Sequence, residues 1–207
     1  MNMLEFPHDT HTHTVYSDGI GSIADNIASA EEKGLKLLGI TDHSHYVVGK
    51  TFNRYIREIR RWGGNESEIT VLTGIEGGNI TPNGVDVPDF VAEKLDYVIA
   101  SVHEWVDTPN EYLDLVKLAL MDENVDVIGH FGGANFPYVG FPSVEELNEV
   151  LELAEAKGKA FEISSRYRVP ELDFIRECIK RGDKAYLRER RSLSRGSWKR
   201  GLERKGL

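Results

Sequence analysis

The segment Lys36-Leu37-Leu38-Gly39-Ile40-Thr41-Asp42-His43 combines two features that decide the fold. It is a short apolar run, and it ends abruptly in an acid and an imidazole. A short run that is apolar throughout is typical of a strand buried on both faces of a parallel sheet. In barrel-like α/β folds, the loops directly after such strands carry the functional groups. The segment therefore predicts both a strand and a polar site at its end.

The same pattern recurs along the chain, with longer amphipathic segments between the apolar runs. Such alternation predicts βαβ units around a parallel sheet or barrel. Ser22 and Asp25 form a capping-box pattern that starts a helix, and Gly34 suits its end. Ser143 and Gly158 bracket Val144–Lys157 in the same way. The predicted strands are Lys36–Thr41, Thr70–Glu76, Asp96–Ser101, Val125–Gly129 and Lys159–Ile163, with shorter ones near Leu4–His8 and Lys184–Leu187, and further helices are expected over Asn110–Asp122 and Pro170–Lys180.

Composition predicts an ordinary soluble protein. The chain has 207 residues, of which 40% are hydrophobic and 29% charged, which suits a single domain with a sizeable core. No stretch approaches the roughly 20 apolar residues of a membrane span. Residues 1–6 lack the basic and apolar regions of a secretion signal. The single cysteine, Cys178, cannot form an internal disulfide, so we expect a cytoplasmic protein.

The histidines indicate a metal site. One histidine alone is more often a core or surface residue than a ligand, but a barrel brings successive strand ends into one mouth. In an extended segment Asp9, His11 and His13 face the same side. Neutral imidazoles and carboxylates suit zinc, manganese or iron, and so many ligands exceed what one ion needs. Each of the seven histidines lies at or just beyond the end of a predicted strand: His8, His11, His13, His43, His45, His103 and His130.

Six short motifs, taken in order, resemble those of the PHP family, the polymerase and histidinol phosphatase superfamily. A further segment, Glu162-Ile163-Ser164 with Arg166 and Arg168 nearby, is similar to the family's Glu-Ile-Asn segment, with Ser164 in place of Asn. The resemblance covers roughly residues 5–170. The six motifs are Asp9-x-His11-x-His13, Ser17-Asp18-Gly19, Thr41-Asp42-His43, Gly74-x-Glu76, Ser101-x-His103 and Gly129-His130.

The resemblance implies a distorted (β/α)7 barrel that holds two to three divalent metal ions. By motif, His11, His13 and Glu76 would hold the first ion. Glu76 would bridge to a second ion held by His103 and His130, and His43 with Asp18 would hold the third. Asp9 and Asp42 would orient these ligands, while His8 and His45 match no ligand of the family.

The catalytic residues implied are Glu76, Asp18 and Arg168. A phosphoester is a poor, negatively charged electrophile, and clustered divalent ions neutralise its charge and supply hydroxide at neutral pH. Arg166 or Arg168 would bind phosphate oxygens in a bidentate manner, with solvated surface as the alternative for both.

We therefore expect a metal-dependent phosphoesterase that hydrolyses a phosphomonoester of a small metabolite or nucleotide, histidinol phosphate being one family substrate. Two alternatives stay open. One is a phosphatase or exonuclease acting on nucleotide or oligonucleotide ends. The other is a non-catalytic metal-binding module. No membrane partner is expected.

The C-terminal segment breaks the pattern. The family's last motif, Gly-Ser-Asp-x-His, is absent after Lys184–Leu187, where Arg188–Leu193 stands instead. Read one nucleotide later, codons permitted for Arg188–Leu193 encode Gly-Ser-Asp-Ala-His. We therefore expect a phosphoesterase domain over residues 1–187, its barrel truncated or frameshifted at the end, and an aberrant basic tail over 188–207.

Charge supports this division. Residues 184–207 carry nine Lys or Arg against two Glu, a net charge of +7. Because the whole chain has a net charge of −9, residues 1–183 carry a net charge of −16. The acidic body argues against long nucleic acid as a partner. The alternative is a genuine nucleic-acid arm, in which Arg190, Arg191, Lys199 and Arg200 contact phosphates and Trp198 stacks.

Overall fold

The computed structural model describes residues 7–64, 67–133 and 135–181. These residues form two compact units. The N-terminal unit comprises the described residues up to Glu76 together with Val87–Val98. The C-terminal unit comprises Gly77–Asp86 and the described residues from Ile99 onward. Each unit has its own strands and its own helical cover.

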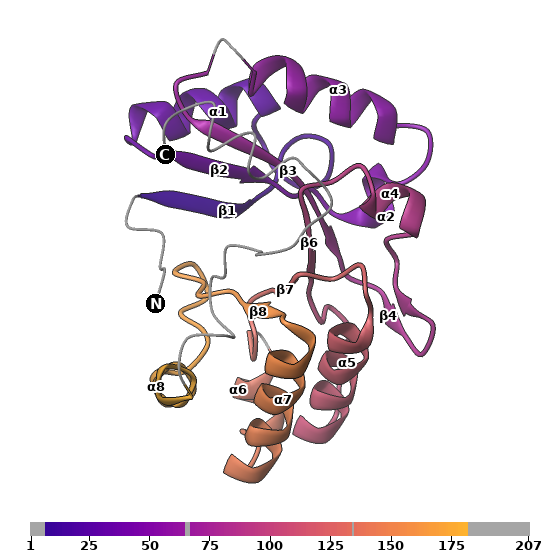
Figure 1. Ribbon diagram of the computed structural model, residues 1–207, viewed down its shortest axis with the longest axis vertical. Helices are drawn as coiled ribbons and strands as arrows, with labels where there is room; N and C mark the ends of the chain where they lie inside the picture. The colour runs from indigo at the N-terminus through magenta and orange to yellow at the C-terminus, as the bar shows by residue number, and fades with distance from the viewer. Residues whose placement is uncertain (1–6, 65–66, 134, 182–207) are drawn as a thin grey trace. The chain divides into compact units, whose positions relative to one another are not determined.

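The N-terminal unit is built on parallel strands. Strand β2 (Leu37–Ile40) lies between β1 (His8–Thr12) and β3 (Thr70–Gly77), with His8 opposite Leu37 and Leu37 opposite Thr70. Helices α1 (Ile23–Glu32) and α3 (Phe52–Trp62) lie on one side of these strands (Figure 1). Two short helices, α2 (Ser44–Val47) and α4 (Asp89–Ala92), complete the unit.

Local sequence explains these elements. Every residue of β2 is buried, as expected of a strand covered on both faces. Ser22 and Asp25 make the reciprocal hydrogen bonds of a capping box at the start of α1. The apolar residues of α3 recur at helical spacing, and Tyr55 and Ile59 on that face are buried.

The C-terminal unit pairs β6 (Tyr97–Ala100), whose last two residues belong to it, with β7 (Val127–Ile128) and β8 (Ala160–Phe161) in parallel. A small antiparallel hairpin joins β4 (Ile80–Thr81) to β5 (Gly84–Val85). Helices α5 (Pro109–Met121) and α7 (Val144–Lys157) lie side by side (Figure 1). Two further helices are α6 (Phe136–Val139) and α8 (Leu172–Lys180).

An aromatic cluster forms the core of the C-terminal unit. Phe131, which directly follows His130, is 1% exposed. Its ring centroid lies 4.6 Å from that of Phe174, 5.2 Å from that of Phe161 and 5.5 Å from that of Phe136. This packing fixes the backbone at the end of β7, where His130 stands.

The strand and helix pattern confirms the predicted α/β class. Hydrogen-bonded strands follow the order β1-β2-β3-β6-β7-β8. The predicted strand at Lys184–Leu187 and the tail 188–207 lie outside the described residues. None of the helices in the described ranges is long and apolar enough to cross a membrane.

One strand lies elsewhere than predicted. The sequence places a short strand near Leu4–His8, whereas β1 begins at His8 and runs to Thr12. Residues 4–6 lie outside the described part of the chain. The polar run Asp9–Thr12 forms a strand because its backbone pairs with β2, with a register shift between Asp9 and Thr12. Backbone pairing does not depend on apolar side chains, so the spacing of apolar residues did not predict a strand at Asp9–Thr12.

Candidate metal centre

The ends of three neighbouring strands bring the candidate ligands of the N-terminal unit together. His13 directly follows β1, His43 follows β2, and Glu76 lies near the end of β3. The backbone continues to pair beyond β2, because His43 and Glu76 form a parallel bridge. The Glu76 amide donates a hydrogen bond to the Asp42 carbonyl at 3.2 Å. Parallel pairing therefore sets the spacing of these side chains.

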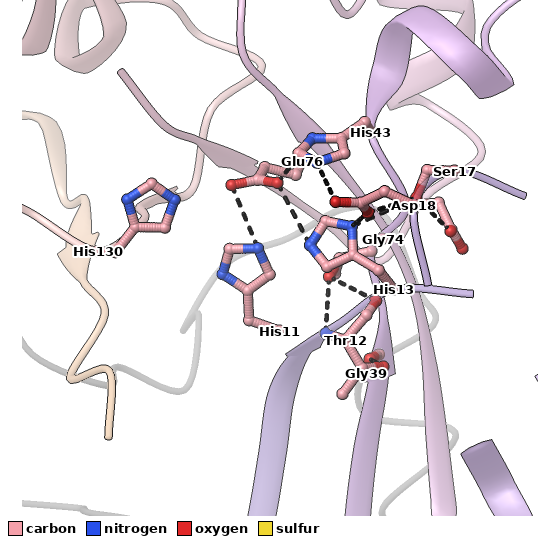
Figure 2. Close-up of polar contacts among 12 residues, drawn as sticks. His11, Thr12, His13, Ser17, Asp18, Gly39, His43, Gly74, Glu76 and His130 are labelled. Atoms are coloured by element: carbon pink, nitrogen blue, oxygen red, sulfur yellow. Dashed lines mark hydrogen bonds and ion pairs between the residues drawn. The ribbon is translucent and has the colours of Figure 1, made fainter. Parts of the chain in front are cut away.

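Glu76 is the centre of the cluster. Its side chain is 1% exposed, and its carboxylate faces the rings of three histidines (Figure 2). Oε1 lies 3.2 Å from His11 Nε2. Oε2 lies 3.4 Å from His13 Nε2 and 2.9 Å from His43 Nδ1. A carboxylate buried this deeply is costly unless ionic or hydrogen-bonding partners compensate it, and the imidazoles supply such partners.

Asp18 joins the same cluster from the loop after β1. Its Oδ1 lies 3.2 Å from His13 Nδ1, and its Oδ2 lies 3.6 Å from His43 Nε2. The side chain is 62% exposed, in contrast to that of Glu76. His13 and His43 thus stand between a buried and an exposed carboxylate.

Among the described residues of the N-terminal unit, the ligand atoms form two groups with metal-binding geometry. Suitable atoms of His11, His13 and Glu76 all lie within 4.8 Å of one another, and so do those of His13, Asp18 and His43. His13 belongs to both groups. Imidazole and carboxylate together are the donor set that zinc, manganese and iron accept, so the residues present fit divalent ions.

Electrostatics differ among the cluster's members. Burial lowers the pKa of His13 below its ordinary value, against the opposing charge of Glu76, which favours the neutral, coordinating form. Burial also acts to lower the pKa of His43, but the hydrogen bond and charge of Glu76 outweigh it and raise that pKa. For Asp18, partial burial acts to raise the pKa, but the adjacent imidazoles of His13 and His43 lower it overall.

Asp42 holds the loop that carries His13 and Asp18. It is 0% exposed. Its carboxylate accepts hydrogen bonds from the Thr14 amide at 2.8 Å, the Thr14 hydroxyl at 2.9 Å and the Ser17 hydroxyl at 2.6 Å. Such partners behind the ligands orient them. Asp9 contacts a residue of its own strand: its Oδ1 accepts a hydrogen bond from the His11 amide at 3.1 Å.

Two tyrosines that the sequence analysis did not name fix the strand ends. The Tyr55 hydroxyl, on α3, lies 3.0 Å from both the Ile40 and the Gly74 carbonyls and accepts from the Asp42 amide at 3.1 Å. Burial raises the pKa of Tyr55, so the hydroxyl stays protonated. The Tyr97 hydroxyl donates to the Thr10 carbonyl. A tyrosine among apolar residues carries no local signal of this function.

The C-terminal unit gathers its own candidate ligands. The rings of His103 and His130 lie 5.5 Å apart between centroids. His130 adopts a φ of 24°, unusual for a residue other than glycine, and its amide donates to Glu162 Oε2 at 2.7 Å. Ring contact also joins His130 to Tyr167, at 5.0 Å. A side chain at Gly78 would collide with the His103 ring, so glycine there leaves room for it.

The remaining candidates lie at the periphery of their units. Arg166 and Arg168 are exposed on the loop between Ser164 and Val169, which form an antiparallel bridge. Arg168 has a φ of 56°. The His45 ring lies 5.4 Å from that of His43 but belongs to neither group of ligand atoms described above.

Parallel strands whose ends carry clustered imidazoles and carboxylates define an α/β protein with a candidate metal centre. Comparison with known families makes this more specific: residues 9–166 match the PHP domain. The chain belongs to the PHP family.

Curated relatives share this region. The chain is 32% identical over 162 residues to a probable phosphatase of Aliivibrio fischeri (strain ATCC 700601 / ES114), covering 76% of this chain and 62% of the relative. It is 29% identical over 167 residues to a probable phosphatase of Clostridium acetobutylicum, covering 78% of this chain and 66% of that one. The chain thus spans under two thirds of the length of these relatives.

A solved structure also aligns with the chain. It is a two-domain protein from Bacteroides vulgatus ATCC 8482 that contains a predicted PHP-like metal-dependent phosphoesterase. The identity is 17% and the TM-score 0.46, with 84% of this chain and 48% of that one covered.

Proposed function

We propose that this chain is a metal-dependent phosphoesterase that hydrolyses phosphomonoesters of a small metabolite or nucleotide. The observation that carries the proposal is the buried Glu76 carboxylate, whose two oxygens lie between 2.9 and 3.4 Å from nitrogens of three histidines. The relatives named probable phosphatases support the same reaction class.

In this proposal His11, His13 and Glu76 would hold one divalent ion, and His43 and Asp18 would contribute to another. Bound ions of this kind lower the pKa of water and neutralise phosphate charge. Zinc, manganese and iron all suit the donor set. The sequence-based expectation of two to three ions per chain is part of the proposal.

The chain's own residues have separate tasks. Glu76 holds the three imidazoles in place from within the protein. Asp18 is the exposed carboxylate of the cluster, and its lowered pKa keeps it ionised near neutral pH. We assign it the role of accepting a proton from the attacking water. Asp42 positions the Thr14–Ser17 segment from behind.

Three sequence-predicted residues extend this proposal. His103 and His130 are predicted to complete a metal site with Glu76, and Arg168 to bind phosphate oxygens. For Arg168 the prediction is a loss of substrate affinity in Arg168→Ala, seen as a raised KM with little change in kcat.

The test is metal-dependent release of phosphate. The purified chain is stripped with chelator, reloaded with manganese or zinc, and assayed on an aryl phosphate. We expect release that requires the metal and is abolished in Glu76→Gln. The matched control is Asp114→Asn, an exposed carboxylate on α5, which should behave like the unaltered chain. Activity that survives Glu76→Gln would refute the assigned centre.

A non-catalytic metal-binding module is the second candidate, favoured by the absence of Gly-Ser-Asp-x-His from the sequence. It predicts bound metal without hydrolysis of the aryl phosphate. For an active chain, histidinol phosphate and nucleoside bisphosphates compared side by side would define the substrate class.

A further inference from the structure

A row of four rings leads from the candidate metal centre of the N-terminal unit to the surface of that unit. The His13 and His43 rings lie 4.5 Å apart between centroids. The His45 ring follows at 5.4 Å from that of His43, and the Tyr46 ring at 4.3 Å from that of His45. The side chains of His13 and His43 are 19% and 16% exposed, whereas Tyr46 is 55% exposed. The inner two rings face Glu76 (Figure 2), and the outer two belong to neither group of ligand atoms described above.

The backbone that carries the two outer rings is fixed. His45 and Tyr46 are the exposed residues of α2, and the flanking Ser44 and Val47 are both 0% exposed. The Thr51 hydroxyl lies within hydrogen-bonding distance of two carbonyls of this helix, that of Tyr46 at 3.2 Å and that of Val47 at 2.9 Å. The two rings are therefore held out from an anchored turn, and a ligand that packs on them has little backbone to order.

Neither packing nor metal ligation explains the outer pair. A single exposed tyrosine is ordinary on a protein surface. Here, however, the tyrosine contacts an exposed imidazole, and that imidazole contacts His43, a candidate metal ligand of the same unit. In parallel α/β folds the segments that directly follow the strands contact the substrate, and α2 begins immediately after His43 at the end of β2. The pair thus lies where a ligand of the metal centre would meet the protein surface.

We propose that His45 and Tyr46 form a specificity site for a flat aromatic ring carried by the alcohol portion of the phosphomonoester. This proposal rests on the proposed function, because it takes the phosphate to be bound at the metal centre of the N-terminal unit. The alcohol portion extends from the phosphate toward solvent, and His45 and Tyr46 continue the row of rings from His43 in that direction. Aromatic rings favour offset-stacked or edge-to-face contact with one another, which a puckered ring of the same size does not offer.

The test compares two ligands that differ only in the flatness of the ring. We use 2-phenylethyl phosphonate and 2-cyclohexylethyl phosphonate, whose carbon–phosphorus bond is not hydrolysed, so that binding is measured without turnover. Their dissociation constants are determined by titration calorimetry on the metal-loaded chain. We expect the phenyl compound to bind about two- to tenfold more tightly, which is what an aromatic pair contributes beyond its buried area. Release of phosphate is followed separately on the two matching phosphate esters.

Substitutions locate the preference. Tyr46→Leu and His45→Ala should each bring the ratio of the two dissociation constants toward one, whereas Tyr46→Phe should retain it. The metal content of these variants, measured by mass spectrometry, should equal that of the parent chain, because neither side chain belongs to the groups of ligand atoms. The matched control is Trp62→Leu, which removes a 37% exposed aromatic side chain at the last residue of α3 and should leave the ratio unchanged.

The outcomes separate the two proposals. A ratio lost in Tyr46→Leu and His45→Ala but retained in Tyr46→Phe, at constant metal content, supports the specificity site. Equal affinity for both phosphonates, no binding of either, a ratio that survives Tyr46→Leu and His45→Ala, or a loss of metal in these variants overturns it, even if phosphate is released. If the ring preference is found without release of phosphate from either ester, the proposed function fails while the ring site stands.

Discussion

Replacement of Asp42 by asparagine should weaken both the fold and the metal centre. The Asp42 carboxylate is fully buried and accepts three hydrogen bonds of 2.6–2.9 Å from Thr14 and Ser17. Asparagine keeps the volume but has one acceptor oxygen in place of two. The side-chain NH2 group of the asparagine is only a donor, so it leaves at least one donor of Thr14 or Ser17 without an acceptor.

The magnitude follows from these bonds. Hydrogen bonds to a charged group contribute roughly 1.5–3 kcal/mol each, and neutral ones about 1 kcal/mol. A buried donor left without a partner costs about 1–3 kcal/mol. Loss of the buried charge offsets part of this, since an ion is costly to desolvate. We expect Asp42→Asn to lower the free energy of unfolding by about 2–4 kcal/mol.

The assay is urea unfolding followed by circular dichroism with chelator present, so that metal does not contribute. A second measurement is metal affinity, which should fall about 10- to 100-fold, as is typical when a partner behind a ligand is lost. Asp114→Asn is the control for removal of a carboxylate. Stability within 0.5 kcal/mol of the parent chain, together with unchanged metal affinity, would refute this account of Asp42.

Three further predictions concern the fold. Gly39→Ala should destabilise the chain by about 1–3 kcal/mol in urea unfolding, because the added Cβ would collide with the Tyr97 hydroxyl; unchanged stability would contradict this contact. Hydrogen bonds from Ser143 lower the pKa of Glu146, so its stabilising effect holds above the unfolded pKa and disappears as pH falls through the folded pKa. Unfolding curves of Glu146→Ala and the parent chain should therefore converge on acidification; a gap independent of pH would be inconsistent with the capping role. Gly158→Ala should cost about 1 kcal/mol in the same assay, because φ is 66° although the space is open; a stabilising effect would contradict the left-handed cap.

Much of the fold could be predicted because the relevant signals are local. Continuous apolar runs predicted β2 and β3, and the strands found lie within one residue of the expected bounds. The cap of α7 was equally visible, since Ser143 and Glu146 bond reciprocally and Gly158 ends the helix in a left-handed conformation. Strand β1 runs over His8–Thr12, beyond the expected range near Leu4–His8. Its polar residues are held by backbone pairing, which the spacing of apolar side chains does not indicate.

The candidate site was predictable to a lesser degree. Motif spacing marked His11, His13 and Glu76 because each stands at or near a strand end. It gave no sign that His13 would belong to both groups of ligand atoms, which depends on the loop that places Asp18 beside it. Nor did it single out Tyr55, whose hydroxyl contacts the Ile40 carbonyl of β2 and the Gly74 carbonyl of β3. Such contacts arise only from the tertiary packing.

The central claim is that buried Glu76 organises a divalent metal centre with His11, His13 and His43. The most direct measurement is the metal content per chain, by mass spectrometry, after reloading and dialysis of the parent chain and Glu76→Gln. We predict that the parent chain retains two to three divalent ions and that Glu76→Gln loses at least one of them while remaining folded by circular dichroism. A parent chain that retains no metal, or a Glu76→Gln variant with undiminished metal content, would contradict the claim.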